Sequence, residues 1–326
     1  MIENIYVEDS IFNNKNVKEI IKKTRAKNII KCQSYKEVFN IKKQNFVLQK
    51  KNPSMILAQK KKNLVLKTPA RFNIGSKNNY YFSHMLNCIF DCEYCFLQGM
   101  YRSANYVLFT NYNSFMNEIK KISELHRNEA VHFFSGYDCD SLALENITNF
   151  AKVFIPYFKK IKNAYLELRT KSTNIKNILS LEPSDNIILA WSLSPNEIAK
   201  NYENKTPSLK KKLKVIKKMQ ELGWQIGLRF DPLIYQNDFN KIYGDFFKTV
   251  FCELCSDKIH SITLGTLRLP KSFLSTIKNL GKASLFFEHK FEDNLYNYKK
   301  IDRNKMINFC YKQVLGNVEK GKIFFN

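Results

Sequence analysis

From residue 105 onward, short apolar runs alternate with longer amphipathic stretches, and this alternation is the strongest constraint on the fold. The runs that predict strands are YVLFT, AVHFFS, AYLELRT, NIILAWSLS, WQIGLRF, HSITLGT and ASLFFEH. Their starts are separated by roughly 20–40 residues, which is the length of one βα unit. Such a series predicts an α/β fold in which a parallel sheet curls into a complete or partial TIM-like barrel.

The stretch PSLKKKLKVIKKMQELG illustrates the helical part of the repeat. The apolar residues that recur there at the spacing of one helix face are Leu209, Leu213, Ile216 and Met219. Pro207 stands near the start of this stretch and Gly223 at its end, as expected for the limits of a helix.

The first 75 residues do not follow this repeat. NVKEIIKKT predicts a helix and KNIIKCQ a short strand, and the following basic segment is expected to be poor in strands and to end in a hairpin around 61–63. We therefore expect three parts: an N-terminal α/β region at 1–75, a partial barrel at 76–290, and a C-terminal helix and tail at 291–326.

Polar side chains directly follow several of the predicted strands. The segments concerned are Gly136–Asp140, Arg169–Ser172, Ser192–Ser194, Arg229–Asp231 and Gly265–Arg268. Because sheets of this kind carry their chemistry at the carboxyl ends of the strands, these segments predict the position of the site.

The chain carries 53 Lys and Arg residues against 29 Asp and Glu residues, a formal net charge of +24. Such a charge favours binding to a polyanion, most simply a nucleic-acid backbone. Only eight of the basic residues are Arg, so a general bias toward Lys is the alternative explanation. Arg169, Arg229 and Arg268 stand at the ends of apolar runs, where a planar guanidinium fork is a plausible requirement.

The sequence predicts a soluble cytoplasmic protein without a membrane partner. Its start lacks the basic region and apolar run of a signal peptide, and no apolar run approaches the ~20 residues of a membrane span. The eight cysteines are then expected to stay reduced, which favours metal or redox chemistry over disulfides. Cys252 and Cys255 are expected to fill the apolar face of a helix.

Three cysteines fall close together in SHMLNCIFDCEYCFLQGMY, at Cys88, Cys92 and Cys95. A zinc site normally needs four ligands, and His84 could supply the fourth. An iron–sulfur cube also usually takes four cysteines, so a cube held by three leaves one iron open to a small molecule. The spacing thus leaves a zinc site and an open iron–sulfur cluster as alternatives.

This spacing, with Tyr94 just before the third cysteine, resembles the signature of radical S-adenosylmethionine enzymes. The segments YDCDSLALE, LELRTKS, TPSLKKKLKVIKKMQELGWQIGLRFDPLI and ITLGTLRLP, together with YKEVFN and SMILAQKKKN upstream, resemble the spore photoproduct lyase family in order. The resemblance covers most of the chain and implies a partial (β/α) barrel of the radical S-adenosylmethionine type.

The family resemblance also implies a reaction and its cofactors. A [4Fe–4S] cluster would bind S-adenosylmethionine and yield a 5′-deoxyadenosyl radical, which takes hydrogen from C6 of a thymine lesion made by ultraviolet light, so that the bond joining the two bases cleaves. The expected partners are damaged DNA, with the lesion turned out of the helix, and a reducing protein such as flavodoxin or ferredoxin. We expect a monomer.

The resemblance assigns the roles of most candidate residues. Cys88, Cys92 and Cys95 would ligate the cluster, and Tyr94 would touch the adenine edge or relay hydrogen. The residues expected to bind S-adenosylmethionine are Ser135 and Gly136 at its amino group, Lys171 at its carboxylate and Ser192 at its ribose.

Arg229 and Arg268 could hold a substrate phosphate or carboxylate as forks. Ion pairs with Glu167 or Asp231 are the alternative for these two side chains.

The chain departs from the family pattern near the reaction centre. Tyr137 stands where lesion-repairing members have the cysteine that donates hydrogen, and Cys139 follows two residues later, so on a strand the two would share a face. Phe96 replaces a second tyrosine of the cluster loop, and the strand pair that inserts into DNA is expected to be short or absent. Two further interpretations therefore stay open: a radical enzyme for another nucleic-acid or small-molecule substrate, and a non-catalytic, zinc-stabilised nucleic-acid-binding protein.

Overall fold

The computed structural model describes residues 2–69, 72–280, 290–292 and 295–326. The strand predicted at ASLFFEH lies outside these residues. None of the helices in the described part combines the length and the apolar character that a membrane crossing requires.

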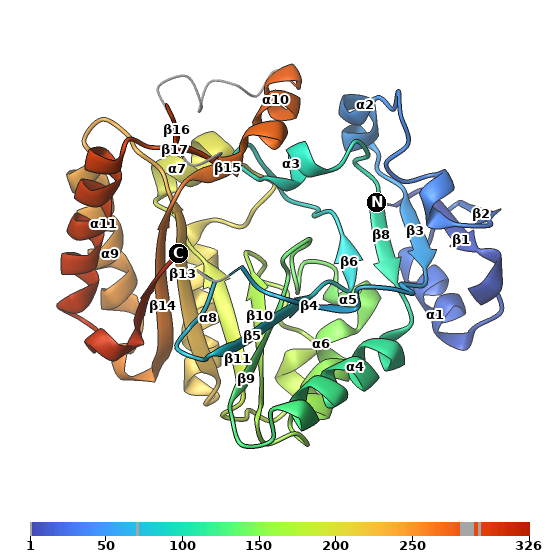
Figure 1. Ribbon diagram of the computed structural model, residues 1–326, viewed down its shortest axis with the longest axis horizontal. Coiled ribbons are helices and arrows are strands. Elements are labelled where there is room, and N and C mark those ends of the chain that lie inside the picture. Colours follow the sequence, from blue (N-terminus) through green and yellow to red (C-terminus); the bar gives the residue numbers. More distant parts are fainter. Residues whose placement is uncertain (1, 70–71, 281–289, 293–294) are drawn as a thin grey trace.

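A curled sheet of eight strands forms the centre of the described structure, in the order β18-β14-β13-β11-β10-β9-β5-β4 (Figure 1). Its strands are β4 (Val65–Lys67), β5 (Asn78–Phe82), β9 (Val131–Ser135), β10 (Ala164–Thr170), β11 (Ile187–Ser192), β13 (Gln225–Leu233), β14 (Ile259–Thr266) and β18 (Ile323–Phe325). The neighbours pair in parallel except β4, which runs antiparallel to β5. The predicted α/β partial barrel is confirmed.

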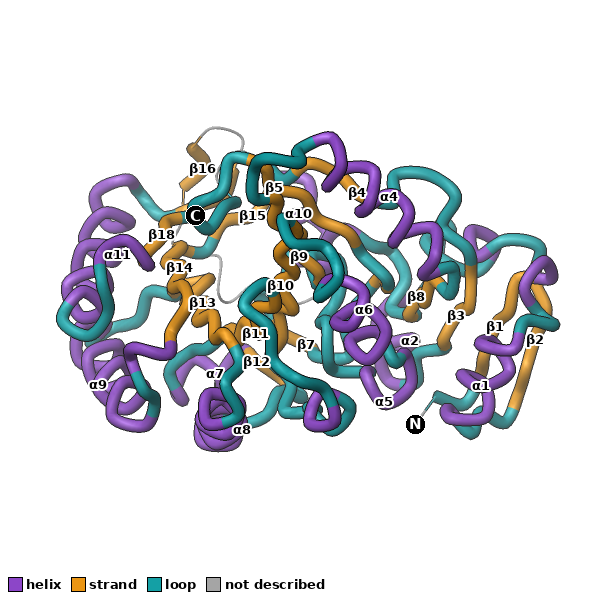
Figure 2. The backbone as a smooth tube through the Cα atoms, turned by 90° about the horizontal axis from the view of Figure 1, so that it is seen from below, coloured by secondary structure: helices purple, strands orange, loops and turns teal. Residues whose placement is uncertain are grey.

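Helices cover the outside of this sheet, as Figure 2 shows from below. They are α4 (Tyr112–Leu125), α6 (Phe150–Phe158), α8 (Leu209–Glu221), α9 (Phe239–Glu253) and α11 (Lys300–Leu315). The apolar residues predicted for the inner face of α8, from Leu209 to Met219, are all buried. Gly223 follows α8 with a φ of 86°, a left-handed conformation that favours glycine at the end of a helix.

A second sheet of five strands lies beside the barrel, in the order β2-β1-β3-β8-β6. Its strands are β1 (Asn4–Glu8), β2 (Asn28–Cys32), β3 (Met55–Ala58), β6 (Met85–Leu86) and β8 (Tyr106–Phe109), with α1 (Lys15–Thr24) and α2 (Phe46–Lys51) on the same side of the molecule (Figure 1). The helix and strand predicted from NVKEIIKKT and KNIIKCQ are confirmed.

Two predictions about these strands are wrong. YVLFT does not begin the barrel: it is β8 and pairs with β3, whereas NNYYF at 78–82 is the first parallel barrel strand. The expected hairpin around 61–63 is absent from the described structure, because β3 and β4 belong to different sheets. NNYYF has only one fully buried apolar side chain, so its hydrophobic pattern did not predict a strand. It forms one because it pairs with the neighbouring barrel strands.

Sheet membership crosses the predicted domain limits. β4 precedes residue 75 but joins the barrel sheet, and β18 follows residue 290 and joins it at the opposite edge. β8 falls within 76–290 but joins the N-terminal sheet. The division at 75 and 290 therefore stays a prediction about the chain, while the two sheets interleave along it.

Short elements gather at the upper edge of the barrel in Figure 1, where the parallel strands end. They are α3 (Leu97–Met100), α7 (Asn196–Tyr202), α10 (Lys271–Asn279) and the antiparallel strands β15 (Arg268–Pro270), β16 (Lys290–Glu292) and β17 (Leu295–Asn297). The short strands β7 (Asp91–Cys92) and β12 (Glu203–Asn204) pair with each other, and α5 (Glu145–Thr148) is drawn lower in the same view. The strand pair expected to be short or absent near the carboxyl terminus is thus present and short, since β16 and β17 pair over three residues each.

A buried ion pair crosses the barrel sheet between β13 and β10. Arg229 donates to both carboxylate oxygens of Glu167, at 3.1 and 2.7 Å, and its remaining N–H groups donate to Ser261 and to the carbonyl of Leu228. A Cβ at Gly227 would come within 2.6 Å of the guanidinium, so this glycine makes room for it. All five donors of Arg229 are therefore satisfied inside the protein.

We predict that R229M destabilises the protein by about 3–5 kcal/mol. The substitution removes the buried partner of Glu167 and leaves the charge of that carboxylate buried. Arg169 also contacts Glu167, at 3.2 Å, but is 26% exposed, so R169M is expected to cost about 1 kcal/mol or less. Urea unfolding of the two variants and the wild type measures both costs. Equal losses for R229M and R169M would contradict this assignment.

Candidate metal centre

The three clustered cysteines lie in the loop that leaves β6 and runs through β7 into α3. Cys92 is 5% exposed, and Cys88 and Cys95 are half-buried. Burial raises the pKa of all three thiols, and the charges of Asp140 and of the other two thiols raise that of Cys88 further. A metal that binds these three thiols must therefore displace their protons.

The cluster loop is fastened to the barrel by backbone and side-chain hydrogen bonds. Cys92 pairs antiparallel with Glu203 of β12, and the amide of Glu93 donates to the carbonyl of Tyr202 at 2.8 Å. The side-chain amide of Gln98 donates to the carbonyl of Cys92 at 2.6 Å. These contacts hold the middle of the loop against β12 and against the start of α3.

The carboxylate of Glu203 is the central group beneath this loop. It accepts hydrogen bonds from Tyr94 Oη at 2.5 Å, Ser194 Oγ at 2.6 Å and Lys171 Nζ at 2.9 Å. Burial alone would raise its pKa, but Lys171 and Lys212 outweigh burial and hold the pKa of Glu203 well below its usual range. Sequence reasoning missed Glu203, which directly follows α7 and lies outside the strand-end segments that the sequence predicted.

Two lysines share this single carboxylate. Lys212 Nζ lies 3.5 Å from Glu203 Oε2 and has no hydrogen-bond partner within the described residues. Burial would lower the pKa of Lys171, yet Glu203 outweighs it and raises that pKa. In the corner beside Cys92 and Tyr94, burial and the charge of Lys171 lower the pKa of Lys212, whereas Glu203 raises it. When both lysines are protonated, this corner carries one positive charge more than Glu203 can neutralise, which suits a ligand with a carboxylate.

His84 does not complete a zinc site. Its ring stacks on that of Phe150, with centroids 3.7 Å apart, and its Nδ1 lies 3.9 Å from Cys139 Sγ. Burial lowers the pKa of His84 to about 3. Within the described part of the chain, no three His, Cys, Asp or Glu side chains converge as one metal ion requires. Because each thiolate of a cluster binds its own iron, the cysteine set fits an iron–sulfur cluster better than a single zinc ion.

The segment that follows β9 is a turn and not an extended strand. Gly136 has a φ of 84°, and a Cβ there would come within 2.6 Å of Ser141 Oγ. Ser135 Oγ is 2.7 Å from Ser141 Oγ and donates to the carbonyl of Glu167, so its hydroxyl already has partners. Asp140 lies in a segment that the sequence predicted for the site but was given no role there; it accepts from the backbone amide of Lys171 at 2.6 Å and so orients that lysine.

The turn separates Tyr137 from Cys139. Cys139 is 5% exposed and packs into the apolar cluster of the N-terminal sheet, with residues such as Val7 and Leu57. Burial raises the pKa of its thiol well above the usual value, followed by the charges of Asp138 and Asp140. Tyr137 and Cys139 would share a face only on a strand, and this condition is not met, because alternation of side chains does not hold for this turn.

Tyr137 instead lies in a half-buried aromatic group. Its ring centroid is 4.6 Å from that of Tyr81, 5.5 Å from that of Phe96 and 6.2 Å from that of Phe72. Phe96 belongs to the cluster loop, so this group connects Tyr137 to the cysteines through side-chain contacts. Tyr81 is a further phenol at this point, and it was missed because NNYYF was not recognised as a barrel strand.

The two predicted substrate-binding arginines both have carboxylate partners. Arg229 is completely buried with every donor used, so its predicted role in substrate binding is corrected to the internal pair with Glu167. Arg268 makes two bonds of 3.0 Å to Asp231 and stands over the ring of Phe72 at 5.2 Å. Its side chain is 20% exposed, so Arg268 borders the aromatic group of Tyr137 at the surface.

Two other sequence expectations concern residues away from the cluster. Ser192 lies buried at the end of β11, on the same edge of the sheet as Lys171. Cys252 and Cys255 are both exposed, so their predicted place on an apolar helix face is wrong. The inner face of α9 is taken by larger aromatic residues such as Phe246 and Phe247.

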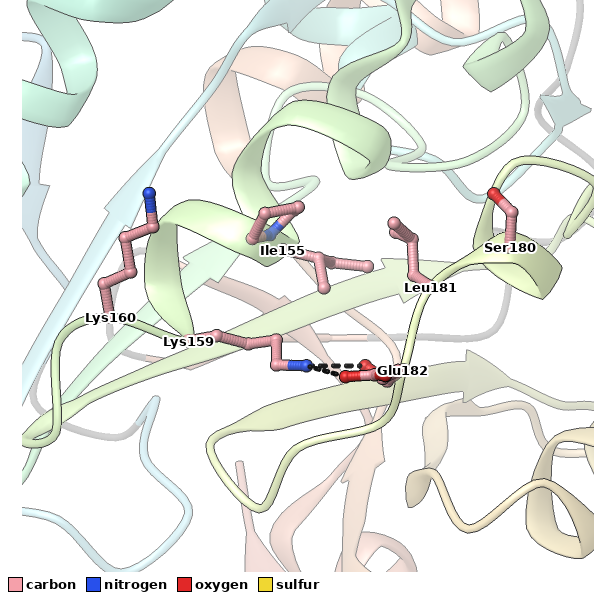
Figure 3. Close-up of a pocket in the computed structure, with 7 residues that line it drawn as sticks. Ile155, Lys159, Lys160, Ser180, Leu181 and Glu182 are labelled. Carbon is pink, nitrogen blue, oxygen red and sulfur yellow. Dashed lines mark hydrogen bonds and ion pairs between the residues drawn. The ribbon is translucent and has the colours of Figure 1, made fainter.

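A surface cavity of about 460 Å³ lies at the opposite edge of the barrel (Figure 3). Lys159 and Glu182 form an ion pair of 3.3 Å at its rim, and Ile155 and Leu181 line it. These residues precede β10 and β11, whereas Lys171 and Ser192 lie at or beyond the ends of the same strands. The cavity is therefore separate from the candidate metal centre.

Comparisons with known proteins agree with this geometry. The family model described as spore photoproduct lyase matches residues 1–313. Spore photoproduct lyases of Clostridium acetobutylicum and Bacillus subtilis are 22% and 21% identical to the chain, over 62% and 56% of it. These matches span 59% and 53% of the two relatives, less than two thirds of their length.

Solved structures of spore photoproduct lyase share the fold along the whole chain. One in complex with dinucleoside spore photoproduct has a TM-score of 0.87 at 14% identity, and covers 100% of this chain and 99% of that one. A double mutant with bound AdoMet and dinucleoside spore photoproduct has a TM-score of 0.84 at 15% identity, covering 100% and 98%. The match of the family model to nearly the entire sequence, on a partial barrel with a three-cysteine loop, shows that the chain belongs to the spore photoproduct lyase family.

Proposed function

We propose that this protein is a radical S-adenosylmethionine lyase that repairs a thymine lesion made by ultraviolet light in DNA. The observation that carries the proposal is the pairing of the three-cysteine loop with Glu203, a buried carboxylate that two lysines, Lys171 and Lys212, approach. When bound, a [4Fe–4S] cluster and S-adenosylmethionine supply an electron and a 5′-deoxyadenosyl radical. The rest of the chemistry belongs to the side chains around them.

Cys88, Cys92 and Cys95 hold the cluster, and Lys171 binds the carboxylate of S-adenosylmethionine. Lys171 is suited to this because Asp140 orients its backbone and Glu203 its ammonium group. The turn at Gly136 lets the backbone approach the amino group of the cofactor, and Ser135 supports that turn through Ser141.

Ser192, at the neighbouring strand end, bonds the ribose of the cofactor. Tyr94 contacts the adenine edge. Its hydroxyl is fixed by Glu203, which places its ring beside the cluster cysteines.

Tyr137 donates hydrogen to the product radical in this proposal. Cys139 is turned into the core of the N-terminal sheet, whereas Tyr137 is half-buried in the aromatic group at the end of β9. In the transfer a C–H bond forms on the product, the O–H bond of Tyr137 breaks, and the unpaired electron moves to the phenol oxygen.

DNA is the proposed substrate because the net charge of +24 favours a phosphate backbone, and because solved family members carry a dinucleoside lesion. The lesion would leave the helix to reach the strand ends. Arg268 is placed to contact it while held by Asp231. We further propose that the enzyme acts as a monomer in the cytoplasm and receives electrons from a protein such as flavodoxin or ferredoxin.

A second candidate function is a radical reaction on another nucleic-acid or small-molecule substrate. It is favoured by one observation: the thiol nearest in sequence to the donor position, Cys139, packs against the N-terminal sheet. A substrate whose product radical needs no thiol would suit such a site. The two candidates share the cluster and the cofactor, and they differ in the reaction that the adenosyl radical starts after cofactor cleavage.

We predict that C88A, C92A and C95A each lose the iron and the brown colour that the wild type takes up in anaerobic reconstitution, because three thiolates are needed to hold the cluster. C139A and C310A, which replace buried cysteines elsewhere, are expected to keep both. Iron analysis and visible absorption measure the difference. A colourless wild type with one bound zinc ion would refute the cluster.

We predict that reduced, reconstituted protein releases 5′-deoxyadenosine from S-adenosylmethionine and restores thymines in DNA irradiated in the dry state. Y137F should still cleave the cofactor but repair at least about tenfold more slowly, since its ring lacks the hydrogen to donate. C139A should repair at the wild-type rate.

Chromatography of 5′-deoxyadenosine and of the digested DNA measures both steps. Cofactor cleavage without any repair by the wild type would favour the second candidate function. If repair is lost in C139A and kept in Y137F, then Cys139 and not Tyr137 is the hydrogen donor.

A further inference from the structure

Lys212 is a buried lysine on a helix whose other lysines face solvent. The buried face of helix α8 consists mainly of Leu209, Leu213, Ile216 and Met219. Lys212 lies on that same face. The lysines of α8 that are exposed are Lys210, Lys211, Lys214, Lys217 and Lys218. A lysine that is 0% exposed at a core position is rare unless a partner keeps it there.

Lys212 faces the carboxylate oxygen of Glu203 that has fewer and longer contacts. Glu203 Oε1 accepts from Tyr94, Ser194 and Lys171, at 2.5 to 2.9 Å. Glu203 Oε2 has only Lys212 Nζ and Thr206 Oγ1, both at 3.5 Å, among the described residues. Lys212 therefore acts on Glu203 mainly through its charge and not through a short hydrogen bond.

The net charge of Glu203 and its two lysine partners depends on Lys212. With both lysines present, Glu203 is neutralised once and one positive charge remains. Without Lys212, Glu203 and Lys171 would form a neutral pair, and the ammonium group of Lys171 would be committed to it. A carboxylate ligand would then have to compete with Glu203 for Lys171.

We propose that Lys212 is a positioning residue that neutralises Glu203 and so leaves the charge of Lys171 free for the carboxylate of S-adenosylmethionine. The proposal rests on the function proposed above. It extends to the cluster, because Cys92 pairs with Glu203 along the backbone. A cluster gains a negative charge on reduction, so the surplus cation also favours its reduced state.

The test compares K212M with K211M, which removes an exposed lysine from the adjoining position of the same helix. Both variants are reconstituted anaerobically, and binding of S-adenosylmethionine is measured by equilibrium dialysis without reductant. K212M is expected to weaken binding at least about tenfold, and K211M to leave it unchanged within about twofold.

A second measurement needs neither S-adenosylmethionine nor turnover. The midpoint potential of the cluster, followed by electron paramagnetic resonance in the absence of S-adenosylmethionine, should become more negative in K212M and stay unchanged in K211M. A purely structural role for Lys212 would lower the melting temperature and leave both the affinity and the potential as in the wild type, which would overturn the proposal.

The double variant E203Q/K212M tests whether Lys212 acts through Glu203. With neither charge present, Lys171 is free again, so binding should return to within about threefold of the wild type. This variant also carries the test if K212M alone does not fold, since it removes Lys212 together with the carboxylate that Lys212 faces. A tenfold loss in E203Q/K212M would overturn the proposal.

The outcomes separate the role of Lys212 from the proposed function. A wild-type protein that takes up no iron, or binds no S-adenosylmethionine once loaded, contradicts the proposed function. A wild-type protein that loads and binds, with K212M indistinguishable from it, contradicts only the role of Lys212.

Discussion

The carboxylate of Glu203 connects the cluster loop to the barrel, and the rest of the site depends on it. It joins Tyr94 of the loop, Ser194 after β11, Lys171 after β10 and Lys212 of α8. A buried carboxylate is costly unless it is paired and hydrogen-bonded, and this one is satisfied only when all four elements are in place. The interaction therefore makes assembly of the barrel edge and placement of the cysteines a single event.

The barrel and the N-terminal sheet meet around the segment 83–110, which passes between them. β5 lies in the barrel, β6 and β8 lie in the five-stranded sheet, and the cluster loop runs between β6 and β8. Both ends of the loop are thus anchored in one sheet, while its middle pairs with β12 in a separate two-stranded sheet and contacts Glu203 there. This arrangement holds the cysteines in place although they lie outside long regular elements.

The turn after β9 separates Tyr137 from Cys139. Gly136 adopts a left-handed conformation, and the chain then places Tyr137 among aromatic rings and Cys139 in the opposite apolar core. A separate ion pair, between Arg229 of β13 and Glu167 of β10, connects these two strands of the barrel sheet. The arginine that the sequence marked for substrate binding thus stabilises the scaffold, and Arg268 alone of the two borders the site.

The sequence by itself determined the repeat of strands and helices, the helix α8 and the cysteine spacing, because periodicity and motif are local properties of the chain. It did not determine that YVLFT belongs to another sheet, that NNYYF opens the barrel, or that Tyr137 and Cys139 point apart. It also did not reveal that Glu203 and Lys212 meet beneath the cysteines. Strand pairing, turn geometry and buried charge pairs depend on residues far apart in sequence, so only the tertiary structure decided them.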